Sequence, residues 1–313
     1  MTNFEGALLF PGQGSQEKGM GRDLAEYWPE AMELWKLGEK ISGLPLREIY
    51  WDGGAEDQAQ TRYLQPAMTV CNLCFWGYLK NQLKPQAVAG HSLGEYSALV
   101  AAKVISLADA LKLVSIRGEL MQEAGNFAPG AMVAVLKISY KDLEKIVSDL
   151  AQQGIILIAN YNTPLQYVVS GENHLIDALL TKIKEIKKAR AIKLPVSGAF
   201  HSPLMKEAAL ELAKEIEKID FSSPEIPIYL NTTGNKELNG DTIKEILKKQ
   251  MTSSVKWIQL IESMYDHDIK NYLEIGPKNV LSKMTAQILH DKEEVTIYKC
   301  SNLKETKQFV QVK

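Results

Sequence analysis

The chain has 313 residues, of which 45% are hydrophobic and 24% charged, a composition that is ordinary for a globular enzyme with a sizeable core. Its 36 basic and 38 acidic residues give a formal net charge of −2, so the overall charge does not point to nucleic acid or a membrane surface as a partner. No apolar run approaches the roughly 18 residues that span a bilayer, and residues 1–10 lack the basic and long apolar regions of a secretory signal.

The first part of the chain alternates short apolar runs with helical patterns. Residues 7–10, ended by Pro11 and Gly12, and residues 87–89, ended by Gly90, are predicted to be buried strands. Helical patterns cover about residues 22–42, 66–83, 93–103 and 107–124. Strands flanked by helices in this way predict an α/β fold with a mostly parallel sheet and helices on both of its faces.

A segment of different character runs from about residue 130 to 195. Its predicted elements are strand 131–136, helix 140–152, strands 155–159 and 167–170, helix 175–187 and strand 191–194. This βαββαβ order is the ferredoxin-like pattern. We therefore predict a small inserted domain over residues 128–197, within a catalytic domain formed by residues 1–127 and 198–313. The catalytic domain is predicted to resume with helix 203–218 and strands 228–230, 272–275 and 296–298.

The cysteines indicate the compartment. There are three of them, Cys71, Cys74 and Cys300, and such a small, odd number fits a reducing environment, so we expect a cytoplasmic protein. Cys71 and Cys74 form a lone C-x-x-C in an apolar stretch typical of a buried helix. No second Cys/His pair is nearby, so core packing is favoured over a redox or metal role.

Gly90-His91-Ser92-Leu93-Gly94 matches the G-x-S-x-G pattern of a nucleophile elbow. An apolar strand precedes it and a helical pattern follows, as an elbow requires. The amides at the start of that helix, Leu93 above all, are placed to stabilise an oxyanion. The alternative is a tight turn with an incidental serine, because the five-residue pattern alone has little specificity.

A serine nucleophile needs a general base. Of five histidines, His91 adjoins Ser92 but is expected to point away, and the others at 174, 267 and 290 lie in polar stretches typical of a surface. His201 lies between small residues and a predicted helix start, with Ser202 as N-cap and Pro203 at the first helical position. It is the candidate base, and a packing role is the alternative. No acid that orients it can be chosen, and a backbone carbonyl would serve equally well.

Arg117 falls on the apolar stripe of predicted helix 107–124, where no residue at i±3 or i±4 can pair with it. A buried guanidinium needs a partner. That partner is either a protein carboxylate or an anionic ligand, and arginine is the side chain best shaped to bind a carboxylate through two hydrogen bonds.

The loop after the first predicted strand, residues 11–16, is rich in glycine and glutamine but matches neither the dinucleotide pattern nor the Walker pattern. Because it follows the carboxyl end of a central strand, Gln13 is a candidate second oxyanion donor.

These segments together resemble the malonyl-CoA:acyl carrier protein transacylases over about residues 6–285. The motifs that carry the resemblance are LFPGQGSQ (9–16), GHSLGEY (90–96), RGELMQ (117–122), NYN (160–162), GAFHSPLM (198–205) and EIGP (274–277). Several long motifs in one order are far more specific than G-x-S-x-G alone. The resemblance implies a hydrolase-like α/β core with a ferredoxin-like insertion.

The resemblance also implies roles. Ser92 would be the nucleophile, His201 the base and Arg117 the ligand of the malonyl carboxylate, with the amides of Gln13 and Leu93 as the oxyanion hole. A main-chain carbonyl often holds the histidine in this family, and Gln250 occupies the matching position. The remaining two implied pocket residues are Phe200 and Asn162. Phe200 resembles the residue that malonyl-specific members of the family have before the histidine.

The expected reaction is a ping-pong transfer of malonyl from coenzyme A to the phosphopantetheine of an acyl carrier protein, for fatty acid or polyketide synthesis, with no metal or redox cofactor. We expect a monomer with no nucleic acid or membrane partner. Two alternatives stay open: a hydrolase of a polyketide pathway that clears acyl groups from the carrier, and a non-catalytic module that docks the carrier protein.

Overall fold

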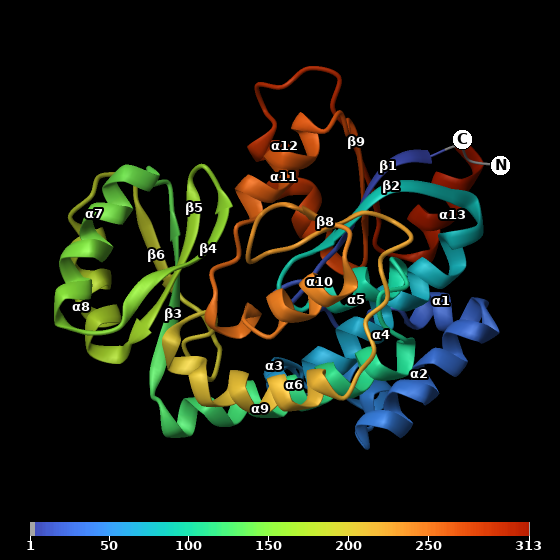
Figure 1. Ribbon diagram of the computed structural model, residues 1–313, viewed down its shortest axis with the longest axis horizontal. Coiled ribbons are helices and arrows are strands. Elements are labelled where there is room, and N and C mark those ends of the chain that lie inside the picture. Colours follow the sequence, from blue (N-terminus) through green and yellow to red (C-terminus); the bar gives the residue numbers. More distant parts are fainter. Residues whose placement is uncertain (1–3, 313) are drawn as a thin grey trace.

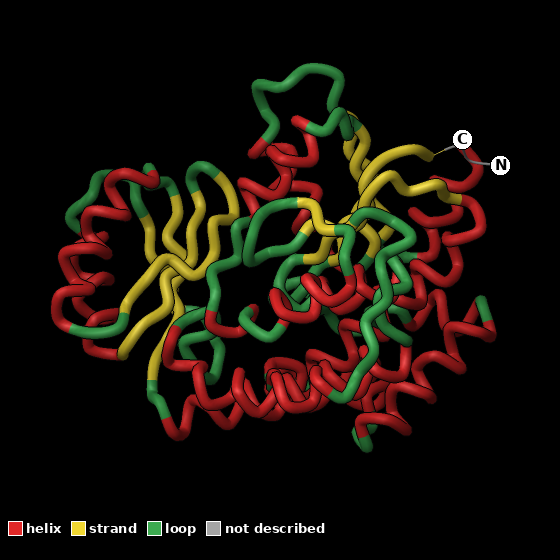
Figure 2. The backbone as a smooth tube through the Cα atoms, in the orientation of Figure 1, coloured by secondary structure: helices red, strands yellow, loops and turns green. Residues whose placement is uncertain are grey.

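The computed structural model describes residues 4–312, which form two separate sheets (Figures 1 and 2). Sheet A has six strands in the order β10-β9-β1-β2-β7-β8. Its strands are β1 (Phe4–Phe10), β2 (Leu83–Gly90), β7 (Ile228–Tyr229), β8 (Lys236–Glu237), β9 (Asn271–Ile275) and β10 (Thr296–Cys300). Only β8 pairs antiparallel in this sheet, so the prediction of a mostly parallel sheet is confirmed.

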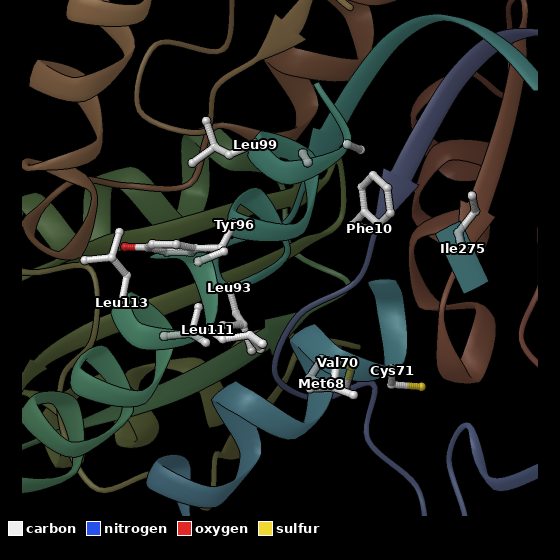
Figure 3. Packing of buried hydrophobic residues seen from close by; sticks show 14 of the residues in the cluster. Phe10, Met68, Val70, Cys71, Leu93, Tyr96, Leu99, Leu111, Leu113 and Ile275 are labelled. Atoms are coloured by element: carbon white, nitrogen blue, oxygen red, sulfur yellow. The ribbon is translucent and has the colours of Figure 1, made fainter. Parts of the chain in front are cut away.

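Helices cover both faces of sheet A, as predicted. Along β1, Leu8 and Phe10 belong to one apolar core while Ala7 and Leu9 belong to the other, the alternation expected for a strand buried on both sides. Figure 3 shows part of the first core, to which Phe10 contributes together with side chains of helices α4, α5 and α6. Within residues 4–312, no helix is both long and apolar enough to cross a membrane.

The helices around sheet A are α1 (Arg22–Tyr27), α2 (Pro29–Ser42), α3 (Ala55–Ala59), α4 (Thr61–Leu79), α5 (Gly94–Ala101), α6 (Leu107–Phe127), α9 (Lys206–Glu217), α10 (Gly240–Leu247), α11 (Trp257–Asp266), α12 (Val280–Ile288) and α13 (Leu303–Val312). The predicted helix 22–42 is divided in two, because Trp28 precedes Pro29 and takes the extended conformation that proline imposes on its neighbour. Helices α3 and α10 to α13 are not predicted from the sequence. Cys71 and Cys74 are free and buried in α4, which agrees with core packing.

Sheet B is antiparallel throughout, with the order β4-β5-β3-β6. Its elements are β3 (Gly130–Leu136), α7 (Tyr140–Leu150), β4 (Ile156–Thr163), β5 (Gln166–Glu172), α8 (Asn173–Lys184) and β6 (Arg190–Lys193). This is the βαββαβ arrangement expected of a ferredoxin-like unit, and it lies to one side of sheet A in Figure 1. All of these elements fall within residues 128–197, and the division into two domains stays a prediction.

The register between β1 and β2 places the site. Phe10 pairs with Gly90, so both strands end at the same level, and the main-chain oxygen of Phe10 accepts a hydrogen bond from the amide of His91 (3.0 Å). The loop that contains Gln13 therefore lies beside the turn that contains Ser92. This is the carboxyl edge of a parallel sheet, where ligands bind in folds of this type.

Candidate active site

Ser92 lies on a tight turn between β2 and α5. Its φ angle is 50°, in the left-handed region that a side chain rarely adopts. A Cβ atom built on Gly94 would clash with the main-chain oxygen of Phe10, and one built on Gly90 would clash with the backbone of Gly94. The two glycines of the motif are therefore required by crowding, as the elbow pattern predicts.

His201 lies before α9 and contacts Ser92, which is 109 residues earlier in the chain. Its Nε2 lies 2.8 Å from Ser92 Oγ, and its Nδ1 lies 3.0 Å from the main-chain oxygens of both Gln250 and Ser253. Carbonyl oxygens only accept hydrogen bonds, so the proton belongs on Nδ1 and the lone pair of Nε2 faces the serine hydroxyl. The structure thus places the main-chain oxygen of Gln250 where the resemblance implied it, and adds Ser253.

The environment keeps the imidazole neutral. Burial and the nearby positive charge of Arg117 lower the pKa of His201 to about 3, because both disfavour the imidazolium. A neutral imidazole with its lone pair directed at a hydroxyl is the form that acts as general base.

Arg117 is 1% exposed, on α6. Its Nη1 donates to Gln65 Oε1 (2.9 Å), and its Nη2 donates to Gln250 Oε1 (3.0 Å) and to Ser92 Oγ (3.3 Å). Within the described part of the chain, no carboxylate forms an ion pair with it, and its Nε–H has no acceptor. Two neutral amides and the Ser92 hydroxyl are its direct partners, and the charge of Glu95 acts on it only from a distance. No described carboxylate binds the guanidinium directly, so an anionic ligand remains the better explanation.

A cavity of about 280 Å³ opens over these groups. All the predicted site residues except Gln250 line it: Gln13, Ser92, Leu93, Arg117, Asn162, Phe200 and His201. Met132, Ala134 and Val168 from sheet B and Val280, Leu281 and Met284 from the region of α12 complete an apolar wall. The site therefore lies between sheet B and the carboxyl edge of sheet A.

His91 also lines this cavity. Its Nε2 lies 2.9 Å from Asn162 Oδ1, and its ring meets that of Trp257 edge to face at 5.3 Å. The ring therefore bonds a side chain of β4, while His201 is the imidazole that contacts Ser92 Oγ. The expectation that His91 turns away from the nucleophile needs this refinement, because its ring still lines the cavity. The other three histidines, at 174, 267 and 290, are exposed.

Three residues that support the site are not predicted from the sequence: Gln65, Asn231 and Ser253. Each bonds a residue more than fifty positions away along the chain, so no local pattern reveals it. Asn231 had one usable signal. It lies two residues after the end of β7, and β7 is parallel to β2, so Asn231 is at the same sheet edge as Ser92.

Comparison with known proteins identifies the family of the chain. The profile of the acyl transferase domain family matches residues 7–310. The malonyl CoA-acyl carrier protein transacylase of Escherichia coli K12 is 36% identical over 291 residues, which cover 92% of this chain and 94% of that protein. The solved malonyl-CoA:acyl carrier protein transacylase of Xanthomonas oryzae has a TM-score of 0.91 at 31% identity, covering 100% of this chain and 99% of that chain.

A second solved relative is a malonyl-transacylase in complex with a type II polyketide synthase acyl-carrier protein. It has a TM-score of 0.92 at 31% identity and covers 100% of both chains. Fold, elbow and family profile together define an acyltransferase. The chain belongs to the malonyl-CoA:acyl carrier protein transacylase family. The roles of individual residues and the lack of a metal or redox cofactor stay predictions.

Proposed function

We propose that the chain transfers a malonyl group from malonyl-CoA to the phosphopantetheine thiol of an acyl carrier protein, through a malonyl ester on Ser92. The observation that carries this proposal is the place of Ser92 Oγ, which contacts His201 Nε2 and Arg117 Nη2 at once. The first contact activates the hydroxyl and the second selects an acyl group that ends in a carboxylate. The relatives above are named for this activity.

In the first half-reaction, Nε2 of His201 takes the proton of Ser92 as Oγ attacks the thioester carbonyl carbon. The amides of Gln13 and Leu93 are proposed to stabilise the oxyanion. The tetrahedral intermediate collapses, the bond from carbon to sulfur breaks, and the CoA thiolate takes the proton from His201. The carbonyls of Gln250 and Ser253 hold the Nδ1–H, so the ring keeps its orientation while its charge changes.

In the second half-reaction the carrier thiol gives its proton to His201, and its sulfur attacks the ester on Ser92. The ester bond breaks, Ser92 Oγ recovers the proton, and the malonyl thioester leaves on the carrier. The apolar wall from sheet B and α12 would limit the access of water to the ester between the two steps.

The direct test is mass spectrometry of the protein after incubation with malonyl-CoA. We expect a malonyl adduct on the peptide that contains Ser92, no adduct in Ser92→Ala, and transfer of the adduct to a holo-carrier protein added afterwards. If no adduct forms, the proposal fails. If the adduct forms but malonate is released as free acid faster than the carrier is loaded, the chain is a hydrolase instead.

The acceptor and the assembly state are parts of the same proposal. One solved relative is bound to a polyketide carrier, so carriers from fatty acid and polyketide synthesis should be compared as acceptors in the transfer step. The monomeric state remains a prediction, which light scattering coupled to size-exclusion chromatography would check.

A further inference from the structure

Glu95 is a buried carboxylate that the mechanism above does not use. It lies in the first turn of α5, three residues after Ser92, and has 0% exposure. One oxygen accepts from the main-chain amide of Asn231 (2.7 Å) and the other from the side-chain amide of Gln250 (3.0 Å). A carboxylate is costly to bury, so its hydrogen bonds to these two partners must be strong. The same bonds fix the positions of the two partners.

The first partner controls the nucleophile. The side chain of Asn231 accepts from the amide of Ser92 (2.6 Å) through Oδ1 and donates to the main-chain oxygen of Gly90 (2.6 Å) through Nδ2. It therefore joins both sides of the strained turn at Ser92. Because Glu95 binds the main-chain amide of Asn231, it fixes the position from which the Asn231 side chain reaches the turn.

The second partner, Gln250, contacts both His201, the proposed base, and the guanidinium of Arg117. Gln250 Nε2 donates to Glu95 and to the main-chain oxygen of Ser92 (3.1 Å), while its Oε1 accepts from Arg117 (3.0 Å). Its main-chain oxygen accepts from His201 Nδ1. A guanidinium has donors only, so the amide of Gln250 must present its oxygen to Arg117, and its nitrogen then needs an acceptor on the opposite side. Glu95 and the main-chain oxygen of Ser92 are its two acceptors, and Glu95 is the charged one.

We infer that Glu95 is a positioning residue for malonyl transfer: one buried carboxylate that holds the turn of Ser92 through Asn231, and holds His201 and Arg117 through Gln250. It deepens the proposed function and rests on it. Many serine enzymes place an acid directly on the histidine; here Glu95 instead binds the side chain of Gln250, whose main-chain oxygen holds His201. Glu95 keeps Ser92, His201 and Arg117 in register without lining the cavity itself.

The strength of these two hydrogen bonds depends on whether Glu95 is ionised. Burial raises the pKa of Glu95 to about 7, although Asn231, Gln250 and the charge of Arg117 lower it in part. The charged or titratable groups that interact with it are Arg117 from α6 and Tyr96 beside it on α5. The ionised carboxylate is the stronger acceptor for both of its hydrogen bonds.

The test is Glu95→Gln, which keeps the shape and removes the charge. Its new NH₂ group must face one of two donors, the amide of Asn231 or the amide of Gln250, unless the amide of Gln250 turns over and presents its NH₂ to Arg117. We expect the rate of Ser92 acylation by malonyl-CoA to fall about tenfold to a hundredfold, the effect of one lost charged hydrogen bond. The preference for malonyl-CoA over acetyl-CoA should fall as well, because Arg117 loses its register.

Glu274→Gln is the matched control. Glu274 is also a buried carboxylate, and it accepts from the amides of Leu281 and Ser282 at the start of α12. This variant should lower the Tm but keep the malonyl preference. The inference is overturned if Glu95→Gln acylates at the rate of the unaltered protein, or if its rate falls while its acyl preference matches that of Glu274→Gln.

Gln250→Met covers the case in which Glu95→Gln does not fold. Methionine keeps the main-chain oxygen that holds His201 and removes only the side-chain amide. Malonyl preference should fall, because Arg117 loses the amide that connects it to Glu95. Unchanged malonyl preference overturns the inference. Failure of the unaltered protein to form a malonyl adduct counts against the proposed function instead.

Discussion

The guanidinium of Arg117 contacts the proposed nucleophile: its Nη2 lies 3.3 Å from Ser92 Oγ. An acyl group bound to that oxygen begins beside the cation, and a carboxylate two carbons beyond the carbonyl remains within its reach. Because Gln65 and Gln250 are neutral partners, no carboxylate binds the guanidinium directly, and we expect it to bind the carboxylate of the acyl group. Arg117 would then distinguish acyl groups by both their charge and their length.

Replacing Arg117 should alter selectivity more than reactivity. In Arg117→Ala we expect kcat/KM for malonyl-CoA to fall by about tenfold to a hundredfold, the value of a charged hydrogen bond, while kcat/KM for acetyl-CoA stays level or rises. Steady-state rates with both thioesters measure this. Arg22→Ala is the control, since Arg22 is exposed on α1. Equal losses with both thioesters would contradict a role in carboxylate binding.

Removing the imidazole should abolish activation of the serine. In His201→Ala we expect the acylation rate of Ser92 to fall about 10²- to 10⁴-fold, the range for loss of a general base. Rapid-quench measurement of the malonyl adduct gives this rate. His174→Ala, on the exposed start of α8, should acylate like the unaltered protein. A fall of less than tenfold in His201→Ala would mean that another group accepts the proton.

The pH dependence of the acylation rate should follow the ionisation of Glu95 and not that of His201. With its pKa lowered to about 3, His201 stays neutral from pH 5 upward and causes no loss of activity near its ordinary value of 6.5. Glu95, with a pKa raised from 4.5 to about 7, is ionised only above that pH. We expect acylation to be slow at pH 5.5, to rise through about pH 7 and to level off above pH 8.

The same measurement on Glu95→Gln separates the two groups. That variant should be slower and should show no inflection between pH 5.5 and 8, because the titrating group is gone. Persistence of the inflection in Glu95→Gln would assign it to a different side chain, and would remove ionisation of Glu95 from the explanation.

The elbow should tolerate no side chain at its second glycine. In Gly94→Ala the new Cβ meets the main-chain oxygen of Phe10, which cannot move without disturbing sheet A. We expect a loss of about 1 to 3 kcal/mol in the free energy of unfolding, typical of overpacking, measured by urea denaturation. Gly54→Ala is the control, because the space around Gly54 is open and its φ angle of −86° suits alanine. Equal stability of the two variants would contradict the crowding described for the turn.

Local sequence was sufficient for those features that depend on neighbouring residues. The elbow is such a feature, because Gly90, Ser92 and Gly94 must be adjacent for the turn to close. The βαββαβ unit is another, because its alternating apolar periods lie in consecutive segments. The place of Arg117 on an apolar stripe also showed that a partner had to come from elsewhere.

Only the tertiary structure decided which partner each polar side chain meets. Gln65, Gln250 and Asn231 come from segments 52, 133 and 139 residues away from the residues they bond. No periodicity encodes such contacts, because they depend on the order in which parallel strands lie side by side and on where each strand ends. For the same reason, the sequence shows Glu95 only as part of the motif around Ser92. Its contacts with Asn231 and Gln250 exist only because β2 and β7 are adjacent in the folded sheet.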